Sequence, residues 1–261
     1  MDILQAVIIA IVEGITEFLP VSSTGHMIIA SSLMGIEKEE FTKLFTVAIQ
    51  LGAIMAVVVL YWRKFFDFKK WQFYLKLIVA VIPAIILGLL FSDNIDALLE
   101  SPTTVGITLI LGGIILLFID RFFQRAAINE ESEISFGKSF VIGMWQCIAM
   151  VPGVSRSAAT IIGGMQQGLT RKLAAEFSFF VAVPTMAAAT GYKLLKGYES
   201  FTPDHVKLLA IGNLVAFIVA IIAIRFFIGF LQKYGFRIFG WYRIIAGIIL
   251  LILIWKGLIV E

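Results

Sequence analysis

The stretch Pro20-Val-Ser-Ser-Thr-Gly-His26 interrupts a hydrophobic region of the chain, residues 3–33, at its middle. A second stretch, Pro152-Gly-Val-Ser-Arg-Ser-Ala-Ala-Thr160, interrupts residues 140–165 in the same way. Each half of these regions is too short to cross a bilayer, and Pro and Gly stop a helix and free backbone groups that lipid cannot satisfy. We therefore expect two re-entrant helical hairpins, with a polar site where their breaks lie.

Six further stretches approach the length of about 20 apolar residues that a membrane-spanning helix needs. They are residues 44–62, 77–91, 103–119, 173–190, 208–224 and 238–255. Of the 261 residues, 60% are hydrophobic and 15% are charged, whereas soluble domains carry about 25% charged residues. The predicted fold is an all-α polytopic membrane protein, a single integral membrane domain (1–261) with six transmembrane helices and two re-entrant hairpins.

The positive charges predict the orientation of these helices. Fourteen of the 21 Lys and Arg residues, Arg243 among them, fall in three loops on one face, six fall on the other face, and Arg156 lies in the second break. Cytoplasmic loops are the ones enriched in Lys and Arg. Both termini are then expected outside the cytoplasm, with the first hairpin entering from outside and the second from the cytoplasm.

Hairpins that enter from opposite faces suggest an inverted-topology repeat. In both halves, a broken hairpin is followed by a Phe-rich span and then by two more spans. We expect approximate half-repeats at 1–120 and 137–261, joined by a cytoplasmic linker, 121–136.

In the first hairpin, Glu13 and Glu17 are spaced i, i+4, which places both carboxylates on one helix face. A charge at bilayer depth costs at least ~2.5–3.5 kcal/mol. Two acids on one face therefore indicate a bound cation, a shared proton or a water-filled cleft. The alternatives are acids that extend to the outer membrane interface and a proton relay in a transporter.

Hydroxyl groups and one histidine follow these acids, at Ser22, Ser23, Thr24 and His26. Histidine can act as an acid, a base or a nucleophile. Hydroxyls alone are weak signals, because Ser and Thr often bond to the backbone of their own helix. Their position beside two carboxylates favours a functional site.

The second break contains Arg156, the only basic residue that we expect at membrane depth. Ser155 and Ser157 flank it, Gly153 precedes it, and Thr160 lies one turn later. A guanidinium group fits phosphate oxygens, and a helix that starts after a Gly turn adds N–H donors. The pattern predicts an anion-binding site. Alternatively, Arg156 neutralises an acid of the first hairpin, which is compatible with anion binding when substrate is absent.

Composition excludes several other kinds of site and partner. One cysteine and two histidines leave no disulfide framework and no Cys- or His-based metal centre, so that any metal must be held by carboxylates. A net charge of +3 without a basic tract makes nucleic acid an unexpected partner.

The segments Glu13-Gly-Ile-Thr-Glu17-Phe-Leu-Pro-Val-Ser-Ser-Thr-Gly-His26 and Pro152-Gly-Val-Ser-Arg-Ser-Ala-Ala-Thr160 resemble the two signature motifs of the undecaprenyl-pyrophosphate phosphatases, the bacitracin-resistance proteins. The resemblance implies hydrolysis of the C55 isoprenoid carrier pyrophosphate to the monophosphate, which recycles the carrier for peptidoglycan synthesis. It also implies a divalent-cation requirement, and a site on the outer side of the bacterial cytoplasmic membrane.

On this interpretation, Glu13 and Glu17 hold Mg²⁺ or Ca²⁺ through oxygen ligands. Ser23 is the preferred nucleophile, with His26 as its base, or His26 is itself the nucleophile and forms a phosphohistidine. The expected phosphate-binding residues are Ser22, Ser23, Thr24, Gly153, Ser155, Arg156, Ser157 and Thr160.

Two other classes of protein remain open. A transporter or lipid flippase would use the same repeat and the same charges. A structural membrane protein would explain the spans but not the clustered Glu, Ser, His and Arg. The expected partners are the isoprenoid pyrophosphate and membrane lipid; the oligomeric state is open, with a homodimer as one option.

Overall fold

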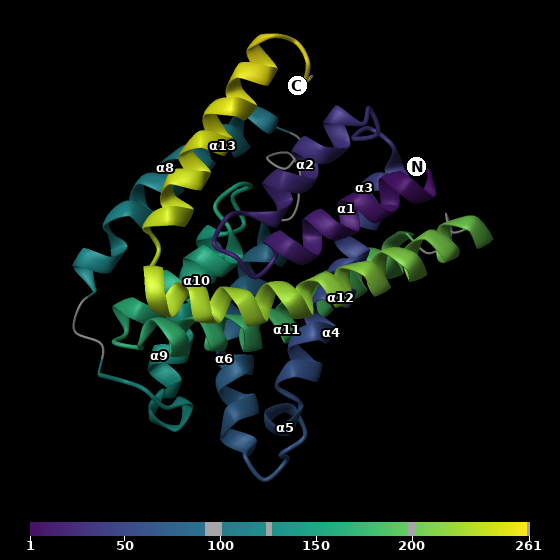
Figure 1. Ribbon diagram of the computed structural model, residues 1–261. Coiled ribbons are helices and arrows are strands. Elements are labelled where there is room, and N and C mark those ends of the chain that lie inside the picture. The colour runs from purple at the N-terminus through teal and green to yellow at the C-terminus, as the bar shows by residue number, and fades with distance from the viewer. Residues whose placement is uncertain (92–100, 124–126, 198–201, 260–261) are drawn as a thin grey trace.

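The computed structural model describes residues 1–91, 101–123, 127–197 and 202–259, and within these ranges it contains helices and no β-strand. The helices are α1 (Ile3–Thr16), α2 (Ser23–Leu33), α3 (Glu40–Ala48), α4 (Gln50–Leu60), α5 (Trp62–Phe65), α6 (Trp71–Leu90), α8 (Pro102–Phe122), α9 (Phe136–Ile148), α10 (Arg156–Gln166), α11 (Arg171–Gly197), α12 (Pro203–Tyr234) and α13 (Arg237–Trp255). A short 3₁₀ helix covers Glu131–Glu133. Figure 1 shows their arrangement.

The six predicted spans are confirmed. In the described part of the chain, six helical segments are long and apolar enough to cross a membrane: α3 with α4, α6, α8, α11, α12 and α13. Their outer faces expose large apolar side chains such as Ile85, Leu111, Ile222 and Ile249. A surface of this kind is stable only against lipid or another apolar partner. The chain is therefore a multi-pass membrane protein.

Both predicted breaks are also present. The first helix, α1, ends at Thr16 and α2 begins at Ser23, while α9 ends at Ile148 and α10 begins at Arg156. Each pair folds back on itself, α1 against α2 and α9 against α10. In Figure 1 the two hairpins reach the centre of the molecule from different sides. These are helical hairpins; their re-entrant placement in the bilayer stays a prediction.

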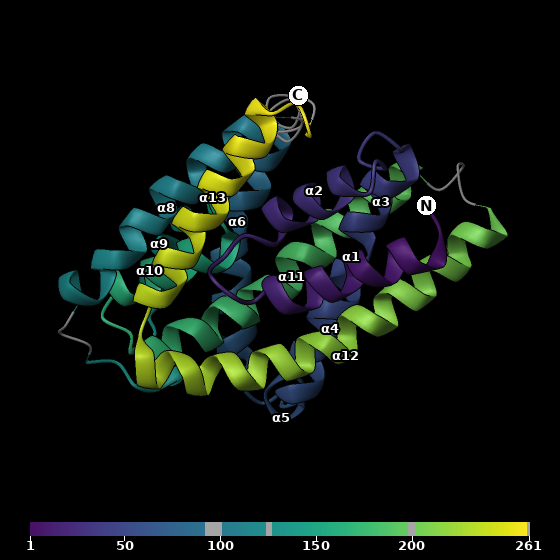
Figure 2. The ribbon, with the colours of Figure 1, turned by 45° about the horizontal axis from the view of Figure 1, so that its top comes forward.

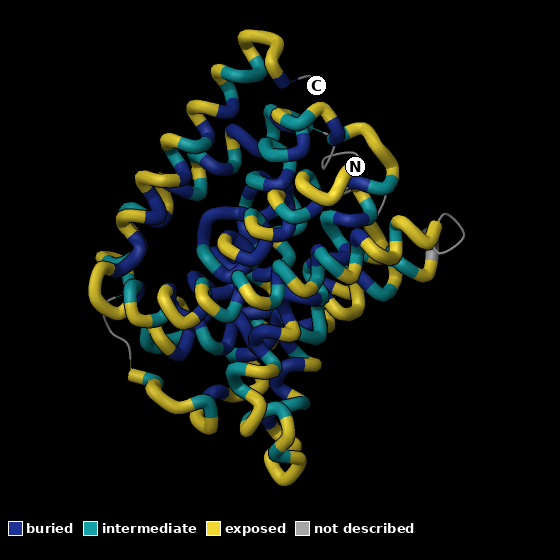
Figure 3. The backbone as a smooth tube through the Cα atoms, turned by 45° about the vertical axis from the view of Figure 1, so that its right-hand side comes forward, coloured by how far each residue is buried: buried dark blue, intermediate teal, exposed yellow. Residues whose placement is uncertain are grey.

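The centre of the molecule is built around α11, the most buried of the six spans. Its residues Phe177, Phe179 and Phe180 are almost entirely buried. Phe179 contacts the ring of Phe18, in the first break, edge to face at 5.2 Å between centroids. Figure 3 shows that the buried residues gather at the centre of the molecule and the exposed ones at its periphery. The first break is therefore held against the protein core, away from the lipid-facing surface.

Helix packing relates the two halves of the chain. The first helix, α1, packs along α12 and α4 also packs on α12, while α9 and α11 both pack on α6. Further large contacts join α8 to α13, α10 to α11 and α4 to α11, and Figures 1 and 2 both show α8 beside α13. If the halves are exchanged, the α1–α12 pair corresponds to α9–α6 and the α4–α12 pair to α11–α6, while α8–α13 and α4–α11 correspond to themselves. In the described ranges, the contact of α10 with α11 has no comparable counterpart between α2 and α3 or α4. This packing is compatible with the predicted inverted repeat, which stays a prediction.

The predicted linker, 121–136, runs from the last two residues of α8 to the first residue of α9 and includes residues 124–126, which are outside the described ranges. Its Glu131 forms an ion pair with Lys64 at 2.8 Å. Lys76 Nζ donates to the carbonyl oxygens of Glu131 and Ser132 at 3.0 and 3.2 Å. The described part of the linker is thus fastened to α5 and α6.

One assignment from the charge count is wrong. Arg243 does not lie in a loop but within α13, with a completely buried side chain. A count of charges along the sequence cannot detect this burial, because Arg243 lies directly before the apolar run that begins at Ile244 and therefore looks like the end of a loop. The other thirteen basic residues lie in the three loops or in the helices that border them, as Lys76 does in α6 and Arg225 in α12, and the predicted orientation keeps its support. Arg156, which is half-buried, is accordingly not the only arginine inside the protein.

Candidate active site

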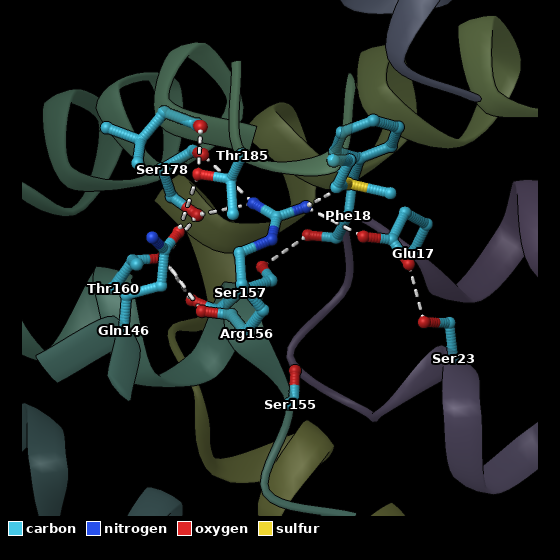
Figure 4. Close-up of polar contacts among 12 residues, drawn as sticks. Glu17, Phe18, Ser23, Gln146, Ser155, Arg156, Ser157, Thr160, Ser178 and Thr185 are labelled. Atoms are coloured by element: carbon cyan, nitrogen blue, oxygen red, sulfur yellow. Dashed lines mark hydrogen bonds and ion pairs between the residues drawn. The ribbon is translucent and has the colours of Figure 1, made fainter. Parts of the chain in front are cut away.

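The two hairpin breaks meet through direct polar contacts (Figure 4). Arg156 Nη2 donates to Glu17 Oε1 at 2.8 Å, forming an ion pair between residues 139 positions apart. Ser157 Oγ donates to the carbonyl oxygen of Phe18 at 2.8 Å. The structure therefore brings together the acid of the first motif and the arginine of the second.

The guanidinium of Arg156 is oriented by α11 and by the first break. Its Nη1 donates to the carbonyl oxygen of Ser178 at 2.9 Å and lies 3.4 Å from Ser178 Oγ. Its Nη2 also contacts the sulfur of Met186 at 3.5 Å, and the guanidinium lies 5.9 Å from the Phe18 ring centroid. The buried Nε has no hydrogen-bond partner. Arg156 is thus held in place with one N–H donor unused.

Two serines start the second helix of each hairpin in the same unusual conformation. Ser22 and Ser155 have φ angles of 72° and 75°, and they are the non-glycine residues with positive φ in the described ranges. Their side chains accept hydrogen bonds from the backbone N–H groups of Gly25 and Ala158. Such backbone conformations cost roughly 1–3 kcal/mol and tend to occur at functional sites. The N-termini of α2 and α10 therefore both lie where the two breaks meet.

A cavity of about 130 Å³ lies between the breaks, enough room for several water molecules. It is lined by seven of the predicted site residues: Glu17, Ser22, Ser23, Thr24, Gly153, Ser155 and Arg156. Five further residues complete the lining: Gln50, Ala149, Met150, Pro152 and Met186. The cavity combines one carboxylate, one guanidinium, several hydroxyls and the starts of two helices, which suits a phosphate group and a cation.

The two acids of the first hairpin differ in their surroundings. Glu17 accepts from Arg156 through Oε1 and from Ser23 Oγ through Oε2, at 2.5 Å. Glu13 is completely buried, and neither of its carboxylate oxygens has a hydrogen-bond partner. A buried carboxylate without a partner is costly, so that Glu13 favours an additional proton or a cation next to it.

The donor set fits a hard divalent cation, which prefers oxygen ligands. Glu13 provides two buried oxygens without partners, and Glu17 follows it one turn later. The described residues contain no group of three or more His, Cys, Asp or Glu suited to a metal. The remaining ligands of a cation would then be hydroxyl groups, water or substrate oxygens.

His26 is turned toward α13. Its Nδ1 lies 2.7 Å from the carbonyl oxygen of Ser22, and its Nε2 lies 2.7 Å from the hydroxyl of Tyr242. In a neutral ring, Nδ1–H donates to the carbonyl and Nε2 accepts the Tyr242 proton. Both ring nitrogens are thus engaged, and His26 is not among the residues that line the cavity. The structure pairs Ser23 with Glu17 and His26 with Tyr242.

Ser157 and Thr160 lie behind Arg156, outside the cavity lining. Thr160 Oγ1 is 2.8 Å from the Arg156 carbonyl oxygen and 2.7 Å from Ser178 Oγ. Ser157 thus connects the start of α10 to the first break through Phe18. Thr160 holds Ser178, which accepts a hydrogen bond from the Arg156 guanidinium. The contact of Ser157 and Thr160 with phosphate stays a prediction.

Several site residues had no motif to identify them. Gln50, which lines the cavity, begins α4 directly after the α3–α4 break at Ile49. A polar residue within an apolar span was the available signal for Gln50 and for Ser178. Nothing in the sequence distinguishes Met186 from the other methionines.

A larger cavity, of about 620 Å³, lies elsewhere, at the end of α8 and the start of α11. It contains the ion pair between Arg171 and Asp120, at 2.7 Å. None of the predicted site residues lines it. Volume alone therefore does not locate the site; the convergence of charged and strained residues does.

The fold and the site define a class: a multi-pass helical membrane protein with a buried polar site at the junction of two broken helical hairpins. The family model of the bacitracin resistance protein BacA matches residues 6–249, and the chain belongs to this family.

Curated relatives match over nearly the whole chain. An undecaprenyl-diphosphatase of Flavobacterium psychrophilum is 60% identical over 256 residues, covering 97% of this chain and 96% of the relative. An undecaprenyl-diphosphatase of Bdellovibrio bacteriovorus is 54% identical, covering 98% of both chains. Undecaprenyl-diphosphatase 1 of Clostridioides difficile is 43% identical, covering 96% of both.

Proposed function

We propose that this protein is an undecaprenyl-diphosphatase, a membrane enzyme that hydrolyses undecaprenyl pyrophosphate to undecaprenyl phosphate and inorganic phosphate. Its membership of the BacA family and the names of its relatives support this function. The observation that carries the proposal is the contact chain from Arg156 through Glu17 to Ser23, which crosses both hairpin breaks. A flippase of the same lipid is the alternative, and the comparisons do not favour it.

The geometry suits phosphoryl transfer, which is catalysed mainly by positioning and by charge stabilisation. Arg156 already presents its guanidinium to an anion, the carboxylate of Glu17, and keeps a free N–H at Nε. A pyrophosphate in the cavity would take over part of this contact. The N-termini of α2 and α10 add backbone N–H groups and a favourable dipole.

Ser23 is the nucleophile that the contacts favour. Its Oγ donates to Glu17 Oε2 at 2.5 Å, so that Glu17 can accept the hydroxyl proton when Oγ attacks the terminal phosphorus. The bond from that phosphorus to the bridging oxygen breaks, and undecaprenyl phosphate leaves. Water would then release phosphate from the serine. In the competing version His26 attacks; its Nε2 would first have to leave the Tyr242 hydroxyl.

Glu13 and Glu17 are the residues that would hold a divalent cation, Mg²⁺ or Ca²⁺. The cation would neutralise part of the pyrophosphate charge and orient its oxygens. In the absence of a cation, the orphaned carboxylate of Glu13 would need a proton.

The proposed setting is the bacterial cytoplasmic membrane, with both termini and the site on the outer side. The excess of Lys and Arg in three loops supports this orientation. There the enzyme would recycle the lipid carrier for cell-wall synthesis and confer bacitracin resistance. We further propose half-repeats at 1–120 and 137–261, which the matching helix pairs α1–α12 and α9–α6 support. The oligomeric state stays open, with a homodimer as one option.

The test is phosphate release from an isoprenoid pyrophosphate by purified protein, with and without a chelator. Arg156→Ala and Glu17→Ala should each abolish release and leave the protein folded, because each removes a group of the contact chain. Arg171→Ala is the matched control, since it removes an arginine–acid ion pair remote from the site. Wild-type turnover by either site variant would overturn the assignment of that residue.

A further inference from the structure

Arg243 binds the backbone of both hairpin breaks at once. Its guanidinium uses all five N–H donors on carbonyl oxygens. The acceptors are Pro20 (3.2 Å), Gly153 (2.8 Å), Val154 (2.9 Å), Thr108 (3.2 Å) and Leu109 (3.4 Å). The first belongs to the break of the first hairpin, the next two belong to the break of the second, and the last two belong to α8.

This arginine is not half of an ion pair. Its side chain is completely buried, and no carboxylate lies within ion-pair distance of it in the part of the chain that the structure describes. A buried charge is tolerated only when it is fully hydrogen-bonded. Here five carbonyl oxygens accept hydrogen bonds from the guanidinium. The same bonds fix the positions of these five carbonyl groups around the planar guanidinium.

The backbone that Arg243 holds leads directly into the site. Pro20 lies two residues before Ser22, and Gly153 and Val154 immediately precede Ser155. Ser22 and Ser155 are the strained residues that start α2 and α10. Such conformations persist only where the surroundings enforce them. Arg243 contributes to this by its hydrogen bonds to Pro20, before Ser22, and to Gly153 and Val154, before Ser155.

The close pair of α8 and α13 makes this reach feasible. A Cβ atom at Gly113 would lie 2.7 Å from the Gly240 carbonyl oxygen, and one at Gly247 would lie 2.7 Å from that of Gly106. These glycines let the two backbones approach, as small residues do in membrane helix pairs. A Cβ at Gly112 would overlap the Arg243 guanidinium itself.

The same helix pair supports the breaks at two further points. Thr108 Oγ1, on α8, lies 2.6 Å from the carbonyl oxygen of Pro152. Tyr242, next to Arg243 on α13, contacts His26 at 2.7 Å. Helices α8 and α13 thus form a frame to which both breaks are attached.

We propose that Arg243 is a positioning residue for the phosphatase reaction. It fixes the two breaks against one frame, and so sets the placement of Glu17 and Ser23 relative to Arg156. Its hydrogen bonds go to backbone carbonyl oxygens, and it is not proposed to touch substrate. This inference rests on the proposed function.

Arginine and lysine differ in the number and the direction of their hydrogen-bond donors. Lysine keeps the positive charge but has three donors on one nitrogen, and cannot bond five carbonyls spread around a plane. Arg243→Lys therefore retains the charge and loses the geometry. A misplacement of about 1 Å at reacting groups costs on the order of 10²-fold in rate.

The experiment compares kcat and KM of wild type, Arg243→Lys and the control Arg237→Lys with an isoprenoid pyrophosphate in detergent. Arg237 lies on the same helix and is exposed. For Arg243→Lys we expect kcat to fall by about 10- to 100-fold, with KM changed by less than about 3-fold, as for an interaction that acts in the transition state. For Arg237→Lys we expect wild-type values.

A milder variant keeps the test valid if Arg243→Lys does not fold. Thr108→Val preserves the shape of the side chain and removes only the hydroxyl that bonds Pro152. It should lower kcat several-fold, with little change in KM or in melting temperature.

Wild-type kcat in Arg243→Lys, or in Thr108→Val when the first variant is unfolded, would overturn the positioning role and leave the proposed function intact. A rise in KM at unchanged kcat would overturn it as well, because that result indicates ground-state binding. Failure of the wild-type protein to release phosphate would overturn the proposed function, and this inference with it.

Discussion

A single carboxylate joins the two halves of the site. Glu17 accepts a hydrogen bond from Arg156 on one oxygen and from Ser23 on the other. Glu13, one turn earlier on the same helix, has none. Because the two acids have different partners, their replacement should have different consequences.

Glu13→Gln separates a cation site from a protonated acid. Glutamine mimics the neutral acid but binds Mg²⁺ poorly. If Glu13 holds a cation, the Mg²⁺ concentration for half-maximal phosphate release should rise at least about tenfold, in line with the loss of a charged oxygen ligand. Titration of activity against Mg²⁺ after chelation measures it. An unchanged titration curve would show that Glu13 works as a protonated acid.

Ser155 offers a second test at the scale of one residue. Its φ of 75° is unfavourable for alanine and acceptable for glycine, and its side chain caps α10. Ser155→Ala loses the cap and keeps the strain, and should destabilise the protein by about 1 kcal/mol. Ser155→Gly should be more stable than Ser155→Ala. Thermal unfolding in detergent ranks the two variants. A higher melting temperature for Ser155→Ala than for Ser155→Gly would show that the backbone at this position is not strained.

At the scale of helices, glycines set how closely the second hairpin approaches α6. A Cβ atom at Gly143 of α9 would lie 2.9 Å from the backbone carbonyl carbon of Ala80. At Gly229 of α12 a Cβ would meet nothing within 4 Å. The two positions are therefore a matched pair for the same substitution.

Gly143→Ala should destabilise the protein by about 1–3 kcal/mol, because the backbones of α9 and α6 must separate. Gly229→Ala should stabilise it by about 0.5–1 kcal/mol, since alanine is the better residue inside a helix. Melting temperatures in one detergent check both signs. Equal shifts for the two variants would contradict the close contact of α9 with α6.

At the scale of the whole molecule, the positive charges predict which face is cytoplasmic. Lys38 and Lys69 are both exposed, and the predicted topology places them on opposite sides of the membrane. Cys147, the single cysteine, is half-buried and can be replaced by alanine to give a clean background.

In that background, an impermeant thiol reagent applied to intact cells should label Lys38→Cys. Lys69→Cys should be labelled only after the membrane is permeabilised. Labelling in the opposite order would invert the proposed orientation and place the termini inside.

The sequence by itself determined the spans, the two breaks and most of the residues that line the cavity. Hydropathy is local along the chain, and a helix break depends on Pro and Gly within a few residues. The motif residues Glu17, Ser23 and Arg156 could be predicted for the same reason, since charged and hydroxyl groups inside an apolar region need a partner.

Only the tertiary structure decided which partners these residues have. It paired Arg156 with Glu17 and not with Glu13, turned His26 to Tyr242 and placed Arg243 between the two breaks. These contacts join residues between 89 and 223 positions apart. They depend on how closely whole helices pack, and above all α8 against α13, where glycines allow the backbones to meet. Side-chain chemistry is fixed by the sequence, but its convergence at one site is a result of helix packing.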